Sequence, residues 1–249
     1  MTPILVGNPV SPYARKALLA LELKGIAYQI DPISPFFGDE RFGEISPLRR
    51  IPVLIEDDFS LCDSSVILQY LEDTRPEPSL LPTDLRERAR ARWIEEWADT
   101  RLGDVVIWKL FNEAVIRPAF WGADRDVEKI AAIASTDLVE VLDWLERQVP
   151  EHGFLFGERP TVADVAVAPF FANLAWGRIP YDAGRWPRTF AWLARMEAET
   201  PLGHLNDVAG QLMRSLPPQH RELLPELGMA VAARTFGTDR PRRGPMTPA

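Results

Sequence analysis

The first 75 residues alternate between short apolar runs and amphipathic segments. Apolar runs at residues 3–7, 26–33 and 51–56 predict three strands. Residues 14–24 place Ala and Leu side chains on one face of a helix, and residues 61–74 lead from a short strand into another helix. This order of strands and helices is typical of an α/β domain with a small sheet covered by helices.

A proline-rich segment separates this region from a longer helical one. We predict that residues 76–86, which contain three prolines, link a first domain at 1–75 to a second domain at 87–215. The second region carries apolar side chains at helical spacing with charged residues between them. This pattern predicts an all-helical domain.

The composition narrows the class of protein. The chain has 249 residues, is 46% hydrophobic and 26% charged, and carries a formal net charge of −8, which favours a globular protein and excludes a primary nucleic-acid binder. No apolar run reaches the roughly 18 residues that a membrane-spanning helix needs. The first residues lack the features of a secretory signal, so we expect a cytoplasmic protein.

The cysteine and histidine content argues against structural metals and disulfides. Cys62 is the single cysteine, and it cannot form an intrachain disulfide. His152, His204 and His220 are scattered along the chain, without the spacing of a metal site. We therefore predict no metal.

The tripeptide Ser11-Pro12-Tyr13 stands where the first strand gives way to a helix. Ser at the N-cap and Pro at the first helical position explain it by structure alone. A helix N-terminus also stabilises an anion such as a thiolate, and the Ser11 hydroxyl could donate a hydrogen bond to a bound sulfur. The residues by themselves leave both interpretations open.

Two further segments can likewise be interpreted as structural or as part of a ligand site. Pro52 lies between Ile51 and Val53 at the start of an apolar run, where a proline that cannot donate a ladder hydrogen bond is tolerated. Asp63 and Ser64 precede an apolar helix, where they would cap it or clamp a charged ligand.

The fourth segment favours a structural role. Thr161 and Asp164 have the spacing of a capping box, in which Thr161 caps the helix and Asp164 reaches back to it. We predict that Asp164 stabilises the fold and takes no part in catalysis.

Taken together, these segments resemble the cytosolic glutathione transferases. The resemblance rests on SPYARKALLALELKGIAYQ, on SPLRRIPVLIEDD followed by LCDSSVILQYLED, and on GERPTVADVAVAPFF, and it spans about residues 3–200. It implies an N-terminal thioredoxin-like domain followed by an all-helical domain, a cis peptide before Pro52, a homodimer, and glutathione as co-substrate.

The resemblance also implies roles for individual residues. Ser11 would activate the glutathione sulfur, Ile51 would pair its main chain with the cysteinyl backbone, and Asp63 and Ser64 would hold the γ-glutamyl end. The family often carries Glu where this chain has Asp63, whose carboxylate is one methylene closer to the backbone. Arg50 would bind the glycine carboxylate in a bidentate way. Arg49 could share that role or belong to a solvated loop.

The residue at the activating position selects the chemistry. Relatives with Cys there perform disulfide exchange, whereas Ser or Tyr activates the thiol toward electrophiles. We therefore expect Ser11 to promote attack on a small hydrophobic electrophile, with Tyr13 and Asn8 as alternative activators. A serine hydrolase is excluded, because Ser11 lies outside a G-x-S-x-G motif and no histidine occurs before His152.

Aromatic residues in both regions are candidates for an apolar electrophile pocket. The candidates are Tyr13, Phe36, Trp108 and Phe111, with Phe37, Phe120 and Trp121 as further members, and aromatic residues at helical spacing also occur as core. The alternative function is a glutathione-binding or regulatory protein of the same fold with little turnover.

Residues 216–249 extend past the matched region. Their apolar spacing predicts a helix at 222–233, and the last dozen residues, which are proline-rich and basic, are expected to be mobile. We expect this extension to pack on the outer surface of the helical domain, with a lid over the electrophile site as the alternative.

Overall fold

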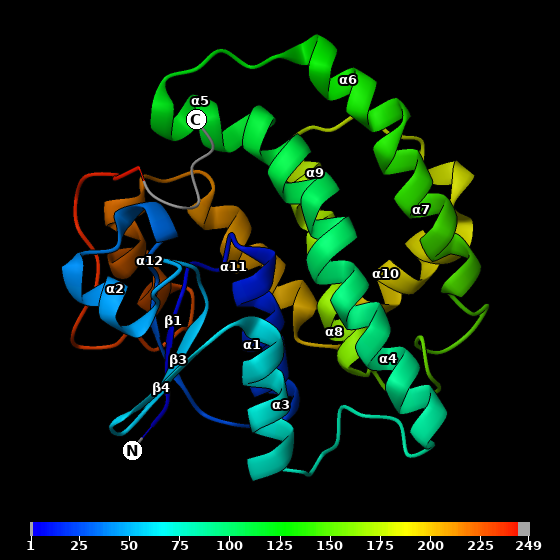
Figure 1. Ribbon diagram of the computed structural model, residues 1–249, viewed down its shortest axis with the longest axis horizontal. Helices are drawn as coiled ribbons and strands as arrows, with labels where there is room; N and C mark the ends of the chain where they lie inside the picture. Colours follow the sequence, from blue (N-terminus) through cyan, green and yellow to red (C-terminus); the bar gives the residue numbers. More distant parts are fainter. Residues whose placement is uncertain (1, 244–249) are drawn as a thin grey trace. The chain divides into compact units, whose positions relative to one another are not determined.

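The computed structural model describes residues 2–243 and divides the chain into two compact units (Figure 1). The first unit combines residues 1–78 with 204–249, and the second consists of residues 79–203. The extension was predicted to pack on the helical domain. This prediction is wrong, because the contacts of residues from His204 onward assign them to the first unit.

A four-stranded mixed sheet forms the centre of the first unit. Its strands are β1 (Ile4–Val6), β2 (Gln29–Asp31), β3 (Val53–Glu56) and β4 (Phe59–Cys62). Their spatial order is β2-β1-β3-β4, in which β1 runs parallel to β2 and antiparallel to β3, and β4 is antiparallel to β3. Together with its helices, this sheet makes the thioredoxin-like domain that the resemblance implied.

Helices complete the first unit. They are α1 (Pro12–Leu23), a 3-10 turn η1 (Pro35–Phe37), α2 (Glu40–Ile45), α3 (Ser64–Thr74), α11 (Leu202–Leu212), which begins at the unit boundary, η5 (Pro217–Gln219) and α12 (His220–Glu226). Figure 1 shows α1 and α3 side by side, and the ammonium of Lys16 on α1 donates to the hydroxyl of Ser65 on α3 over 2.7 Å. Leu5 and Val53 of the sheet and Leu18 and Ile67 of these helices are almost completely buried, so the sheet and helices form one core.

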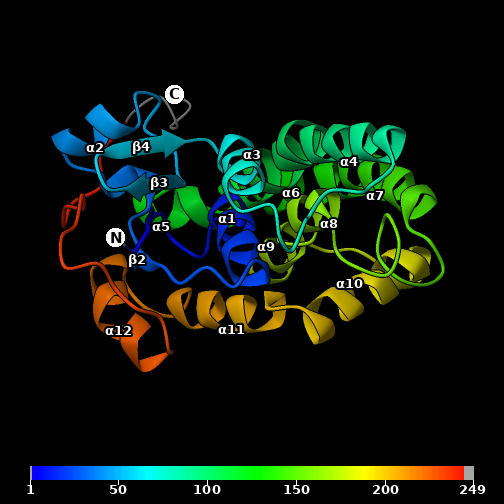
Figure 2. The ribbon, with the colours of Figure 1, turned by 90° about the horizontal axis from the view of Figure 1, so that it is seen from below.

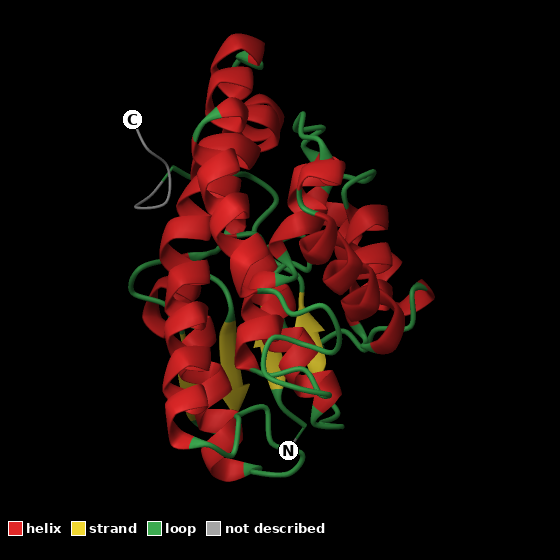
Figure 3. Cartoon of the chain, turned by 90° about the vertical axis from the view of Figure 1, so that its right-hand side faces the viewer, coloured by secondary structure: helices red, strands yellow, loops and turns green. Residues whose placement is uncertain are grey.

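The second unit is helical. Its helices are α4 (Leu85–Trp97), η2 (Ala98–Leu102), η3 (Asp104–Ile116), α5 (Arg117–Trp121), α6 (Val127–Ser135), α7 (Asp137–Gln148), α8 (Val162–Val167), α9 (Phe170–Trp176), η4 (Ala183–Arg185) and α10 (Pro187–Glu199). All residues of this unit are described, and none lies in a named strand. Figure 3 shows the helices of the chain in red and its strands in yellow. The all-helical prediction is therefore confirmed, although α4 begins within the last two residues of the predicted linker.

Asp164 has the structural role that its spacing predicted. The capping box with Thr161 is present, and the completely buried Asp164 carboxylate also accepts from the Leu155 N–H at 2.8 Å and from the Trp192 ring N–H at 2.9 Å. Burial is the largest influence on the pKa of Asp164 and raises it, while these donors oppose the shift. Asp164 therefore joins α8 to the preceding loop and to α10.

The C-terminal segment returns to the edge of the sheet. The predicted helix at 222–233 is wrong in its second half, because α12 ends before Gly228, whose φ of +84° breaks it, and the chain then runs beside β2. Ile30 donates to the Ala230 carbonyl at 2.8 Å and accepts from the Ala232 N–H at 2.9 Å. Figure 2 shows this path from α12 past β2 toward α2.

The basic end of this segment also has defined partners. The Thr238 N–H donates to the Phe37 carbonyl and the Arg242 N–H to the Phe36 carbonyl, at 2.8 and 2.7 Å. These hydrogen bonds disagree with the prediction, made from composition, that the last dozen residues are mobile. The final residues of that prediction, 244–249, lie outside the described part of the chain.

Candidate functional site

Three loops of the first unit meet at one end of its sheet. Val6 at the end of β1 pairs with Val53 at the start of β3, which pairs with Cys62 at the end of β4. The segments beyond these residues, 7–11, 51–52 and 63–64, therefore leave the sheet at the same end. Gly7 makes the approach possible, because a Cβ there would lie 3.2 Å from the Cβ of Ala14 and 3.5 Å from that of Ile51.

Ser11 is the N-cap of α1. Its Oγ accepts a hydrogen bond from the Ala14 N–H at 3.4 Å, and its backbone is extended, with φ −72° and ψ 126°. The structural interpretation of Ser11 therefore holds. Ser11 is only half-buried, and its hydroxyl proton has no acceptor among residues 2–243, so the hydroxyl can still donate to a ligand at the helix N-terminus.

The two alternative activators differ in their surroundings. Asn8 is buried, and its side-chain amide donates to the Pro32 carbonyl at 3.1 Å while its oxygen accepts from the Val10 N–H at 3.0 Å. Its polar atoms are therefore already used inside the protein. Tyr13 is half-buried in the first turn of α1, two residues beyond Ser11.

The peptide between Ile51 and Pro52 is cis, as the resemblance implied. Pro52 has no N–H, and the main-chain N–H and C=O of Ile51 have no hydrogen-bond partner within the described chain. Ile51 thus presents both a donor and an acceptor beside the sheet, which is the pair of groups that an extended peptide requires.

Asp63 and Ser64 occupy the N-terminus of α3. One Asp63 carboxylate oxygen accepts from the N–H groups of Ser65 and Val66, at 3.0 and 3.3 Å, and Asp63 has a positive φ of +83°. The second Asp63 oxygen, and the N–H and hydroxyl of Ser64, have no partner among the described residues. A strained, non-glycine backbone beside unused polar groups is a recognised feature of ligand sites.

The adjacent arginines have different surroundings. The Arg49 guanidinium donates to the main-chain carbonyls of Gly38 and Asp39 and lies over the Phe42 ring, 5.5 Å from its centroid. Arg49 therefore braces the loop before α2. Arg50 is exposed, and its main chain exchanges hydrogen bonds with the Ser46 hydroxyl.

The candidate electrophile residues are divided between the two units. Tyr13 and Phe36 belong to the first unit, where Phe36 is buried and its carbonyl accepts from the C-terminal segment. Trp108 and Phe111 lie on η3 of the second unit, half-buried and buried respectively. Their assignment to an electrophile pocket stays a prediction.

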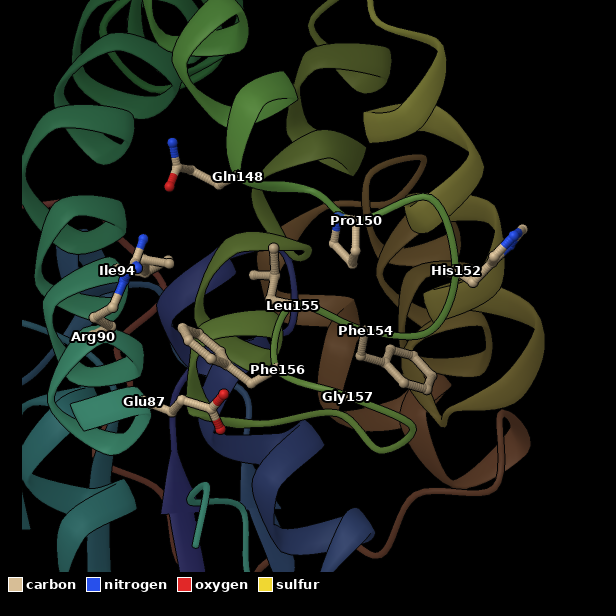
Figure 4. A pocket seen from close by; sticks show the side chains of 10 residues that line it. All are labelled: Glu87, Arg90, Ile94, Gln148, Pro150, His152, Phe154, Leu155, Phe156 and Gly157. Carbon is tan, nitrogen blue, oxygen red and sulfur yellow. The ribbon is translucent and has the colours of Figure 1, made fainter. Parts of the chain in front are cut away.

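The second unit has a pocket of its own between α4 and the loop after α7 (Figure 4). It has a volume of about 420 Å³ and is lined by Glu87, Arg90, Ile94, Gln148, Pro150, His152, Phe154, Leu155, Phe156 and Gly157. None of the residues that the sequence singled out for glutathione or electrophile binding lines it.

Sequence reasoning missed two residues that shape the site. Gly7 gave no signal beyond its place in an apolar run, although its lack of a side chain lets α1 and the cis-proline loop approach. His220 appeared only as a scattered histidine, yet it is buried against Asn8, with 2.7 Å between His220 Nδ1 and Asn8 Nδ2. A contact across 212 residues leaves no local pattern in a sequence.

The part of the chain that the structure describes holds neither a cluster of metal-ligating side chains nor a membrane-spanning helix. No group of three or more His, Cys, Asp or Glu side chains in residues 2–243 is arranged to hold a metal ion. Within the same range, no helix combines the length and the apolar character needed to cross a bilayer.

Comparisons with known proteins agree with this architecture. Residues 5–79 match the glutathione S-transferase N-terminal domain, and residues 84–195 match the glutathione S-transferase C-terminal domain. The chain thus has both domains of one class of enzyme, in the order of the two units. It belongs to the glutathione S-transferase family, a family of glutathione-dependent enzymes, with glutathione as its co-substrate.

Individual relatives cover most of the chain. Maleylacetoacetate isomerase of Mus musculus is 28% identical over 255 residues, covering 99% of this chain and 96% of that protein. Glutathione S-transferase U14 of Arabidopsis thaliana is 33% identical over 186 residues, 69% of each chain. A solved glutathione S-transferase of Methylobacterium radiotolerans, in complex with glutathione sulfonate, is 27% identical with a TM-score of 0.68, covering 81% of this chain and 92% of its own.

Proposed function

We propose that this protein binds glutathione at the end of the first unit's sheet and that Ser11 activates its thiol for attack on a small hydrophobic electrophile. The observation that carries the proposal is the set of unused polar groups there. They are the Ser11 hydroxyl proton, the Ile51 main chain, the second Asp63 oxygen, and the N–H and hydroxyl of Ser64. A peptide with two carboxylates and one amine needs donors and acceptors of these kinds.

Each group has a chemical role in this proposal. The N–H and C=O of Ile51 pair with the cysteinyl main chain, while Ser64 donates to the γ-glutamyl carboxylate and Asp63 accepts from its amine. The exposed Arg50 guanidinium binds the glycine carboxylate in a bidentate way. These contacts hold the sulfur near the N-terminus of α1.

The reaction begins with loss of the thiol proton to solvent. The Ser11 O–H and the positive end of the α1 dipole stabilise the thiolate, which lowers the pKa of the bound thiol. The thiolate sulfur then donates an electron pair to the electrophilic carbon, a C–S bond forms, and the leaving group departs with the electrons of its own bond. Atoms and charge balance without an oxidant or reductant.

One experiment separates this proposal from the alternative of a binding or regulatory protein. The protein is applied to glutathione-agarose, eluted, and assayed with a generic aryl-halide electrophile and glutathione. We expect retention and turnover. Retention without turnover would favour the binding protein, and a failure to be retained would contradict the proposed site.

Glutathione-dependent isomerisation is a second candidate. The observation that favours it is the match to Maleylacetoacetate isomerase of Mus musculus over nearly the whole of both chains. A thiolate that adds to an activated double bond leaves a single bond that can rotate, and expulsion of the same thiolate restores the double bond. Such a reaction would not consume glutathione, whereas conjugation consumes one glutathione for each product formed.

We also propose a homodimer, in which the first domain of one subunit meets the helical domain of the other. Each unit carries exposed apolar side chains that would support such a contact. Phe59 on β4 and Val66 on α3 are 44% and 47% exposed in the first unit, and Trp93 on α4 is 53% exposed in the second. Twofold pairing is also the commonest state of soluble oligomers.

A further inference from the structure

A chain of hydrogen bonds links α12 to the turn that carries Ser11. The Nε2 of His220 lies 3.1 Å from the Leu212 carbonyl, and its Nδ1 lies 2.7 Å from the side-chain nitrogen of Asn8. A carbonyl can only accept, so Nε2 carries the ring proton and Nδ1 accepts from Asn8. His220 and Asn8 are 4% and 5% exposed, so water cannot easily replace either partner.

Asn8 fixes the turn before α1 through its side-chain amide and its main-chain carbonyl. Its second amide hydrogen donates to the Pro32 carbonyl at 3.1 Å, its side-chain oxygen accepts from Val10 N–H at 3.0 Å, and its main-chain carbonyl accepts from Ser11 N–H at 2.9 Å. The orientation of the Asn8 side chain therefore sets the path of the chain from residue 8 to residue 11.

We propose that His220 is a positioning residue for thiol activation: through Asn8, it holds the turn that places Ser11. The inference rests on the proposed function of Ser11 and extends it to α12, which lies beyond the part of the chain that matches the two family domains. The C-terminal segment is then a component of the glutathione site rather than an external brace.

Other contacts hold α12 in place without His220. Arg221 donates to the buried Asp31 carboxylate at 2.8 Å, and Leu224 is completely buried. Loss of the His220 acceptor should therefore leave α12 attached while it frees the Asn8 side chain to rotate. We therefore expect residues 8–11 to shift and the stabilisation of the bound thiolate to weaken. The glutathione contacts at Ile51 and Ser64 should change little.

The test measures ionisation of bound glutathione by the ultraviolet absorbance of its thiolate as a function of pH. We expect His220→Leu to raise the pKa of the bound thiol by about one unit and to lower kcat/KM for the electrophile about tenfold. The KM for glutathione should stay nearly unchanged. His220→Asn, whose oxygen can accept in place of Nδ1, should restore both values. An unchanged thiol pKa in His220→Leu would overturn the proposal.

Leu224→Ala is the matched control on the same helix. It removes packing without touching Asn8, so we expect a lower melting temperature and an unchanged thiol pKa. An equal rise in the thiol pKa in Leu224→Ala would assign the effect to packing and contradict positioning by His220.

Two further variants complete the design. If His220→Leu does not fold, His220→Gln replaces it, because a Gln amide reaches the position of Nε2 and leaves Asn8 without its acceptor. Equal behaviour of the Asn and Gln variants would contradict the proposal. Ser11→Ala is titrated in parallel: if it leaves the thiol pKa unchanged, the proposed function fails, and if it alone raises that pKa, only the role of His220 fails.

Discussion

The side-chain amide of Asn8 donates a hydrogen bond of 2.7 Å to Nδ1 of His220, which lies 212 residues further along the chain. This contact joins the first loop of the thioredoxin-like domain to the helix α12. It gives the C-terminal segment a direct connection to the turn that ends in Ser11, and it makes the protonation state of one histidine relevant to folding.

Stability should fall in mild acid because of His220. Burial lowers the pKa of His220 below its usual value near 6.5, so the unfolded chain binds a proton at a higher pH than the folded one. The stabilisation is complete above the unfolded pKa and is lost as the pH falls toward the folded pKa. We expect the melting temperature of the natural protein to drop more between about pH 7.5 and about pH 5.5 than that of His220→Asn. Equal drops would contradict this assignment.

Ser64→Ala should weaken glutathione binding. The Ser64 hydroxyl is proposed to hold the γ-glutamyl end in the ground state as well as in the transition state, so its loss raises the KM for glutathione and leaves kcat nearly unchanged. We expect an increase of about 10- to 150-fold, because a hydrogen bond to a charged group contributes about 1.5–3 kcal/mol. Steady-state kinetics with varied glutathione measure the KM, with Thr74→Ala, at the exposed far end of the same helix, as the control. An unchanged KM in Ser64→Ala would remove Ser64 from the site.

Removal of residues 229–249 should destabilise the protein. Ile30 then loses both main-chain partners, and the buried Asp31 loses the Thr235 hydroxyl and the Phe236 N–H, at 2.7 and 2.8 Å. Hydrogen bonds of this kind contribute about 1 kcal/mol each, so we expect the melting temperature to fall by several degrees. A chain that stops at Arg243 keeps these bonds and serves as the control. A melting temperature equal to that of the control would contradict the role of this segment.

Phe59→Asp should weaken the proposed dimer. Phe59 contacts the Tyr70 ring, 5.4 Å between centroids, and leaves much of its own ring exposed on β4. A carboxylate at this place would be buried without a partner in an apolar interface. Sedimentation equilibrium at micromolar concentration should show a dimer for the natural chain and a monomer for the variant. A monomer for the natural chain would refute the dimer itself, and Val127→Asp, on an exposed helix end outside the proposed faces, is the control.

Local patterns predicted the elements that depend on local physics. Ser11 at the start of α1, Pro52 before β3, and the capping box of Thr161 and Asp164 all occupy the places that their residue types favour. The prediction of a helix at 222–233 was wrong in its second half, because the same apolar spacing fits a short helix followed by an extended segment. In that extended segment, Val231 forms a β-bridge with Ile30. Such pairing with a distant strand has no signature in the segment itself.

The candidate site was predictable only in part for the same reason. Each of its three loops carries a recognisable dipeptide or tripeptide. Only the resemblance to one family predicted that all three bind glutathione. That Arg49 braces the loop before α2, while its neighbour Arg50 is exposed, depends on the position of the Gly38 and Asp39 carbonyls. The contact of His220 with Asn8 depends on the whole first unit being folded.

The most direct test of the central claim compares Ser11→Ala with Tyr13→Phe in steady-state assays with glutathione and an aryl-halide electrophile. We predict that Ser11→Ala lowers kcat/KM at neutral pH by about 10- to 1000-fold with little change in affinity for glutathione, because it removes one preorganised donor to the thiolate. Tyr13→Phe should stay close to the natural protein. Near-full activity of Ser11→Ala together with a loss in Tyr13→Phe would contradict the account.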